Sequence, residues 1–281
     1  LTGLSRRRRL VSQEASVKYF LLGALSSAIF LYGIALVYGA AGSFQLGIIA
    51  QASMTQISGS KIFAAGMILL AVGLLFKVGA VPFHNWTPDV YTGAPSPVTA
   101  FMSIATKVVA VLGLMRVMYV ALGAMRWDWQ LLLAVVAVAS MAVGAIVGLS
   151  QTDMKRMLAY SSIAHAGFIM VGVVGAYTLQ TGQRPDQTGS VSSVLIYLAG
   201  YGLATIGFFM VILMVRKAGG ESTEIDSWAG LGRRHPMLGA LIVLFMLSFA
   251  GIPATAGFTG KLFVFLAGWR GGYAWLVIGG V

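Results

Sequence analysis

One stretch of this chain decides how the rest must be packed: residues 76–107 read FKVGAVPFHNWTPDVYTGAPSPVTAFMSIATK. It places two lysines, one histidine, one aspartate and four prolines between long apolar runs. A bilayer core offers no water to charges or to unpaired backbone groups. A segment this polar at membrane depth must therefore line a protein interior or a hydrated cavity. The stretch is predicted to hold a functional site.

The composition predicts a protein that is solvated by lipid. Of the 281 residues, 58% are hydrophobic and only 10% are charged, against about 25% charged in a typical soluble domain. The sequence has no cysteine, which excludes a thiolate-held iron–sulfur cluster, a cysteine-based structural zinc site and any disulfide. Any electron transfer is therefore expected on another chain, and no cofactor or metal is predicted on this one.

The apolar runs predict one all-helical transmembrane bundle that extends over residues 1–281. Runs long enough to cross about 30 Å of hydrocarbon fall near residues 19–39, 62–92, 97–119, 130–149, 157–176, 191–215 and 237–268, with a further span from about 273. Those at 62–92 and 237–268 are interrupted. The chain opens on Leu and closes within an apolar run, which suggests an internal fragment of a longer polypeptide.

The distribution of basic residues predicts the orientation of the bundle. If the run Arg6–Arg9 is cytoplasmic, the connectors on that side also carry Lys18, Lys155, Arg156, Arg216, Lys217, Arg233 and Arg234. The opposite side carries Lys61, Arg126, Arg184 and Arg270. This bias fits the positive-inside rule and explains the net charge of +11 without nucleic acid. The alternative for Arg6–Arg9 is a patch for anionic lipid or nucleic acid.

The other cations lie inside apolar runs, and no carboxylate lies in the middle of a span. These four are Lys77, Lys107, Arg116 and Lys261. A charged lysine at the bilayer centre costs at least about 2.5 kcal/mol, so each needs a partner, water or a neutral state. Arg116 lies close enough to a helix end to extend its head to the interface.

Lys107 is the deepest of these cations. At about 1.5 Å per residue it lies some 15 Å from either end of its span, and Ser103 and Thr99 precede it on the same helical face. The polar stripe indicates a proton or ion pathway. The alternative is a structural lysine that bonds backbone carbonyls.

The interrupted runs resemble the broken helices of transporters, which hold ions or protons at unpaired backbone groups. In the first, Pro82 and Pro88 are predicted to break the helix near Lys77, His84 and Asp89. In the second, the predicted breaks are Gly251, Pro253 and Gly257, next to Lys261. The pair predicts an internal repeat, with residues 1–125 forming most of one half and 126–281 most of the other. For Lys77 the alternative is a charge that merely complements a helix C-terminus.

Histidines and hydroxyls could join the three lysines. His165 follows Tyr160 and Ser161 within a span, and imidazole passes protons near neutral pH; a packing histidine is the alternative. Because burial favours the neutral form of lysine, Lys77, Lys107 and Lys261 are predicted to form a lateral proton relay.

Four motifs resemble the subunit N family of bacterial NADH-quinone oxidoreductase, respiratory complex I. They are residues 76–107, EASVKYF at 14–20, LSQTDMKRMLAYSSIAH at 149–165 and GIPATAGFTGK at 251–261. The resemblance implies an antiporter-like fold with fourteen helices and two inverted five-helix repeats, each with a discontinuous helix, in the bacterial plasma membrane. It assigns the channel lysines to Lys77, Lys107 and Lys261.

The resemblance also implies partners and a secondary relay. The secondary residues are His84, His165, Glu14, Lys18 and Asp89. A family glutamate that pairs with the residue matching Lys77 belongs to a preceding helix that this sequence does not contain. The partners implied are other membrane subunits of complex I, with NAD, FMN, iron–sulfur clusters and quinone bound on partner subunits.

Two alternatives share these features. An Mrp-type cation/proton antiporter or a membrane-bound hydrogenase subunit would have the same fold and lysines, and would differ in its neighbouring chains and in sodium dependence. A non-conducting scaffold would hold pump subunits together without moving protons.

Overall fold

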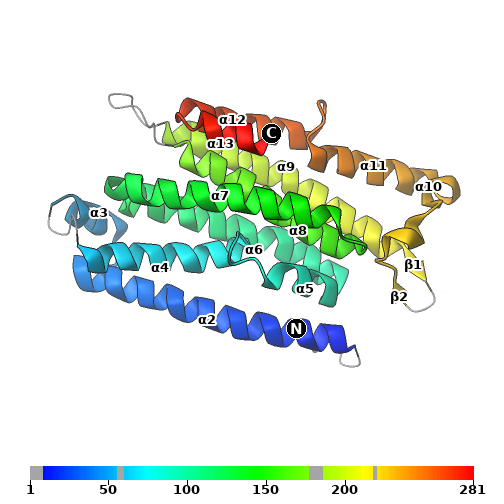
Figure 1. Ribbon diagram of the computed structural model, residues 1–281, viewed down its shortest axis with the longest axis horizontal. Coiled ribbons are helices and arrows are strands. Elements are labelled where there is room, and N and C mark those ends of the chain that lie inside the picture. The colour runs from blue at the N-terminus through cyan, green and yellow to red at the C-terminus, as the bar shows by residue number, and fades with distance from the viewer. Residues whose placement is uncertain (1–8, 56–59, 177–185, 218–219) are drawn as a thin grey trace.

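A computed structural model describes residues 9–55, 60–176, 186–217 and 220–281 as one layered bundle of helices (Figure 1). The helices are α2 (Leu10–Ala41), α3 (Leu46–Thr55), α4 (Lys61–Val78), α5 (Trp86–Gly93), α6 (Ser96–Arg116), α7 (Arg126–Leu149), α8 (Met154–Val174), α9 (Gln187–Met214), α10 (Leu231–Arg234), α11 (Pro236–Ala250), α12 (Ala256–Arg270) and α13 (Ala274–Gly280). The other described elements are a π-helical turn that continues α6, η1 (Val117–Ala121), two 3-10 helices, η2 (Gly123–Met125) and η3 (Ile225–Trp228), and a hairpin whose strands have two residues each, β1 (Arg216–Lys217) and β2 (Gly220–Glu221). The all-helical membrane fold is confirmed.

Six helices in the described part of the chain are long and apolar enough to cross a membrane. They begin at Leu10, Lys61, Ser96, Gly123, Met154 and Gln187, as the apolar runs predict. The first begins well before residue 19, because Glu14 and Lys18 form an ion pair one turn apart at 2.6 Å that favours helix there. Its 32 residues extend about 48 Å, so its first turns lie beyond the hydrocarbon.

Both predicted interruptions exist, and the two halves at each are joined in the same way. At the first break, Gly79 has φ 78° and its N–H donates to the carbonyls of Leu75 and Phe76. At the second, Gly251 has φ 81° and its N–H donates to the carbonyls of Leu247 and Ser248. A positive φ suits glycine at a helix C-terminus. The path from α4 to α5 runs opposite to that from α11 to α12 (Figure 1).

Two predicted break residues lie in the following helices instead. Pro82 and Pro253 lie between the half-helices, whereas Pro88 is in the first turn of α5 and Gly257 in the first turn of α12. A first-turn N–H has no intrahelical partner, so proline is tolerated there. Gly257 lets the start of α12 approach the end of α11 closely, because an added Cβ would overlap the carbonyl oxygen of Ser248.

The connectors rich in basic residues gather at one end of the bundle, as the predicted order of spans requires. The start of α2, the end of α5, the hairpin and α10 lie together at that end, while α3 and the end of α12 lie at the other (Figure 1). These elements, the N-cap of α2 and the start of α8 hold the described basic residues that were assigned to this end: Arg9, Lys18, Lys155, Arg156, Arg216, Lys217, Arg233 and Arg234. Arg6 to Arg8 and Arg184 lie outside the described residues.

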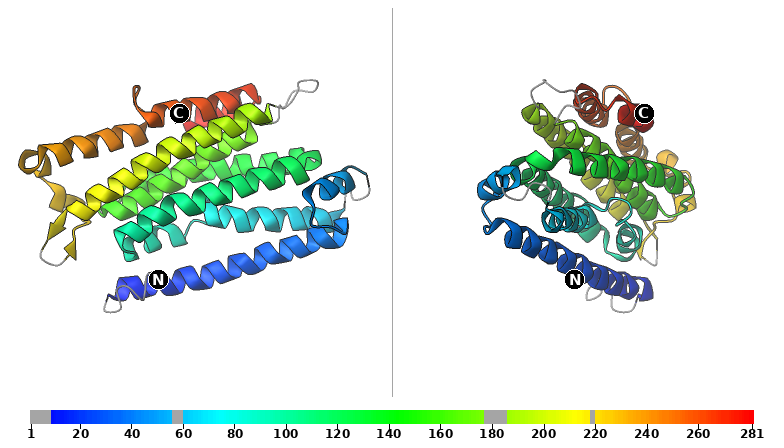
Figure 2. Two further views of the ribbon diagram at one scale, coloured as in Figure 1. Left: turned by 180° about the vertical axis from the view of Figure 1, so that it is seen from behind. Right: turned by 60° about the vertical axis from the view of Figure 1, so that its left-hand side comes forward.

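Helix α8 lies inside the bundle and positions the site. It is the most buried of the six long helices and α2 is the least. It packs against α7, α9 and α12, while α2 and α11 to α13 form opposite outer sides (Figure 1, Figure 2). Polar groups on α8 are therefore shielded from lipid.

Candidate functional site

The site is centred on Lys107 in α6, whose side chain is only 3% exposed. Its Nζ donates to the carbonyl oxygen and to the Oγ of Ser162 in α8, both at 2.6 Å, and lies 5.4 Å from the centroid of the Tyr201 ring in α9. Thr99 and Ser103 are buried on the same face of α6. Among the described residues no carboxylate pairs with Lys107, so neutral oxygens and a π face hold this cation.

His165 lies one turn beyond Ser162 on α8 and is buried. Its Nδ1 and the Tyr197 hydroxyl share a hydrogen bond. Its ring centroid lies 4.5 Å from that of Tyr201 and 5.6 Å from that of Phe168. Tyr201 therefore contacts both the Lys107 ammonium and the imidazole.

Lys261 lies on the other side of His165. Its Nζ donates to the carbonyl oxygen of Ala250 at 3.0 Å and lies 4.7 Å from the centroid of the Phe168 ring. Ala250 ends α11, and a helix C-terminus carries partial negative charge that favours a cation. Lys107, His165 and Lys261 thus form a row of three titratable groups from α6, α8 and α12.

Lys77 does not belong to this row. It lies in the last turn of α4, is half-buried, and faces a hollow on α2 lined by Ser16, Tyr19 and Ser27. Within the described part of the chain its ammonium has no hydrogen-bond or ion-pair partner, and its nearest π contact is Phe76 at 5.8 Å. This is the helix-end position that the alternative interpretation predicts.

His84 lies in the break between α4 and α5. Its Nδ1 is buried and has no hydrogen-bond partner among the described residues. Trp86 donates its indole N–H to the Phe76 carbonyl in the last turn of α4 at 2.9 Å.

The secondary residues Glu14, Lys18 and Asp89 meet at the basic end of the bundle. Lys18 Nζ lies 2.6 Å from Glu14 Oε1 and 2.7 Å from Asp89 Oδ2. Arg156 Nη1 lies 3.2 Å from Asp89 Oδ1. All four side chains are partly exposed, so this network adds little stability.

Tyr91 lies between that network and the buried row. Two positions after Asp89 in α5, its hydroxyl lies 3.3 Å from Ser162 Oγ, and its carbonyl accepts from Thr99 Oγ1 at 3.3 Å. The hydroxyl of Ser162 thus contacts both Lys107 and Tyr91, which makes it the link between α5, α6 and α8.

Several functional candidates are absent from the sequence predictions. Sequence reasoning singled out Tyr160 and Ser161 near His165, but the partners of the buried row are Ser162, Tyr197, Tyr201 and Tyr91. The spacing of Tyr197 and Tyr201, four residues apart in a span, was an available signal because both hydroxyls then share one helix face.

A buried ion pair was also missed. Lys155 Nζ lies 2.8 Å from Glu221 Oε2, with side chains 1% and 8% exposed. No local pattern joins residues 66 positions apart. No group of three or more His, Asp or Glu side chains able to hold a metal occurs in the part of the chain that the structure describes.

These features define a class: a polytopic helical membrane protein with two oppositely directed broken helices and a row of titratable groups, of which Lys107 and His165 are buried and Lys261 is partly exposed. The model of the family described as NADH:quinone oxidoreductase/Mrp antiporter, TM, matches residues 2–281, and the chain therefore belongs to that family.

Individual relatives confirm the resemblance to subunit N. NADH-quinone oxidoreductase subunit N of Cutibacterium acnes is 74% identical over 281 residues, which are 100% of this chain and 52% of that protein. The subunit N of Rhodococcus opacus is 52% identical over 100% of this chain and 50% of that protein. The chain thus spans about half the length of the curated relatives it matches.

Solved structures share the fold. A chain of respiratory complex I from Thermus thermophilus is 37% identical with a TM-score of 0.79, over 97% of this chain and 56% of that chain. A chain of the Mrp complex from Dietzia sp. has a TM-score of 0.84 at 23% identity, over 97% of this chain and 48% of that chain. This match shows likeness of fold alone.

Proposed function

We propose that this chain is part of a proton-translocating membrane subunit of NADH-quinone oxidoreductase. Protons would pass along Lys107, His165 and Lys261, coupled to NADH oxidation and quinone reduction on other subunits. The observation that carries the proposal is the Lys107 ammonium, buried without a described carboxylate partner and hydrogen-bonded to the Ser162 hydroxyl. Such a group is costly to keep in a membrane unless it functions.

The surroundings of each group suggest how a proton would move. The Ser162 hydroxyl can accept from Lys107 and donate to a neighbour, so it can pass a proton from the ammonium toward Tyr91, Tyr201 or water. Charge that arrives on His165 would repel the cations on both sides of it and favour release from Lys261. Motion of one charge would thus drive the next.

Lys77 and His84 would extend this path on the α4 side. Lys77 faces the hollow on α2, where the family glutamate of a preceding helix could approach it. The opposite directions of the two broken helices support inverted repeats in residues 1–125 and 126–281.

The proposed setting is the bacterial plasma membrane, with the end that holds Arg9 and the hairpin in the cytoplasm. The excess of basic residues at that end supports this orientation. The partners would be other membrane subunits of complex I, and those partner subunits would carry NAD, FMN, iron–sulfur clusters and quinone.

Replacement of Lys107 by alanine tests the proposal. The intact complex with Lys107→Ala, reconstituted in liposomes, is expected to assemble but to lose acidification of the lumen during NADH oxidation. Arg116→Ala is the matched control, because this cation lies nine residues further along the same span and is exposed. If this chain were a non-conducting scaffold, the complex with Lys107→Ala would pump at the parent rate. Unchanged pumping in both Lys77→Ala and Lys107→Ala would exclude the relay.

A further inference from the structure

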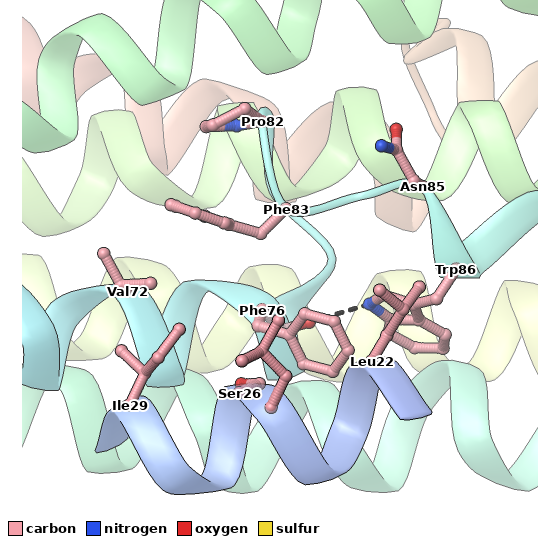
Figure 3. A pocket seen from close by; sticks show the side chains of 10 residues that line it. Leu22, Ser26, Ile29, Val72, Phe76, Pro82, Phe83, Asn85 and Trp86 are labelled. Atoms are coloured by element: carbon pink, nitrogen blue, oxygen red, sulfur yellow. Dashed lines mark hydrogen bonds between the residues drawn. The ribbon is translucent and has the colours of Figure 1, made fainter. Parts of the chain in front are cut away.

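A cavity of about 240 Å³ lies between α2 and the break that joins α4 to α5 (Figure 3). Its walls are aliphatic and aromatic side chains, among them Leu22, Ile29, Val72, Phe76 and Phe83. An apolar cavity of about 150 Å³ holds a benzene ring. This one therefore has room for a ring with a short alkyl chain.

The cavity contains one hydroxyl that no described group satisfies. Ser26 is 5% exposed, lines the cavity, and its Oγ has no hydrogen-bond partner among the described residues. Other serines of α2 behave differently: Ser16 donates to the Ser12 carbonyl at 2.7 Å and Ser27 to the Gly23 carbonyl at 2.8 Å. A buried hydroxyl without a partner is unfavourable. The Oγ is covered in this structure, so the Ser26 side chain must turn toward the cavity that it lines in order to bond a ligand.

The other polar groups of the cavity wall limit which kind of ligand the cavity can bind. The Trp86 indole N–H is already bonded to the Phe76 carbonyl, and Asn85 lies across the cavity from Ser26 (Figure 3). Aromatic rings pack well against aromatic walls, and one hydroxyl suits one hydrogen-bonding head. We propose that the cavity is a binding site for a small lipophilic phenol, whose ring lies against Phe76 and Phe83 and whose hydroxyl bonds Ser26 Oγ.

Such a ligand would contact the broken helix on both sides of its interruption. Phe76 lies in the last turn of α4 next to Lys77, and Phe83 lies in the break itself. A molecule wedged there would hold the break in one arrangement and slow any transfer that needs it to move. That consequence rests on the proposed function, whereas binding itself does not.

Photolabelling of the intact complex tests the site. The probes are diazirine derivatives of para-propylphenol and of propylbenzene, and labelled peptides are mapped by mass spectrometry. The phenol is expected to label peptides that contain residues 22–29 or 72–86. Ser26→Ala should raise its half-maximal concentration about two- to tenfold, the effect of one lost hydrogen bond, and leave the propylbenzene probe unchanged. Ser27→Ala is the matched control and should change neither.

A second variant keeps the test decisive if Ser26→Ala fails to assemble. Val72→Phe adds bulk to the opposite wall and should lower labelling by both probes more than tenfold. Equal labelling by the two probes, unaffected by Ser26→Ala, would show a groove for a lipid chain and overturn the proposal. Labelling that Val72→Phe leaves unchanged would place the ligand elsewhere and would also overturn it. Because no pumping is measured, these results are independent of the proton relay.

Discussion

The buried pair of Lys155 and Glu221 joins three elements at the basic end of the bundle. Lys155 Nζ also donates to the Ala94 carbonyl at 3.0 Å, and Glu221 Oε2 also accepts from Ser96 Oγ at 2.8 Å. The start of α8, the start of α6 and strand β2 therefore meet at one charge pair. We predict that Glu221→Gln loosens the segment that follows, residues 222–228.

The size of the effect follows from burial. Loss of one partner from a buried ion pair costs about 3–5 kcal/mol, because the other charge is left uncompensated. A glutamine can still accept from Ser96 Oγ, so the lower value applies. At 1.4 kcal/mol for each factor of ten, about 3 kcal/mol raises the opening equilibrium of the segment about a hundredfold.

Hydrogen–deuterium exchange of the intact complex measures this opening. The amide of Ile225, which donates to the Thr152 carbonyl at 2.9 Å, should exchange about a hundredfold faster in Glu221→Gln. Glu224→Gln is the control, since Glu224 is exposed. The double variant Lys155→Met with Glu221→Met should recover much of the protection, because a neutral pair leaves no buried charge. Exchange of the Ile225 amide at the parent rate in Glu221→Gln would show that this charge pair does not hold the segment closed.

Two further predictions concern the buried row and the second break. Ser162→Ala removes one of the two oxygens that accept from Lys107, a charge-assisted bond worth about 1.5–3 kcal/mol. This variant should slow lumen acidification about tenfold, whereas Ser161→Ala should not. Equal rates in the two variants would contradict the role of Ser162. Gly257→Ala puts a Cβ onto the Ser248 carbonyl and should lower the yield of assembled complex on a native gel. Gly47→Ala, where an added Cβ meets nothing within 4 Å, should leave the yield unchanged. A normal yield for Gly257→Ala would show that the α11–α12 break can widen without cost.

Local patterns in the sequence predict much of this fold. Apolar runs locate the spans, and glycine and proline locate both breaks, because a lipid environment tolerates few other arrangements of the backbone. The stripe of Thr99, Ser103 and Lys107 likewise follows from helical spacing and is buried as predicted. Pro88 and Gly257 show the limit of this reasoning, since a helix can begin at or just before such residues.

Contacts between distant segments could not be predicted. Lys107 and Ser162 are 55 positions apart, and only the packing of α6 on α8 brings them together. The sequence left two positions open for Lys77, and only the packing of α4 on α2 shows that it lies at a helix end beside a hollow on α2. Charges that a connector seems to expose, such as Lys155 and Glu221, are buried because the hairpin folds back onto α8.

In the proposed function, Lys107 works by releasing and rebinding a proton rather than by supplying a fixed charge. Lys107→Arg separates the two, because a guanidinium keeps its charge and cannot be deprotonated in a protein. The direct measurement is the number of protons moved per NADH oxidised by the reconstituted complex with this substitution. If Lys107 must release its proton, that ratio falls clearly in Lys107→Arg with assembly intact; a ratio equal to that of the parent complex would show that a fixed charge suffices.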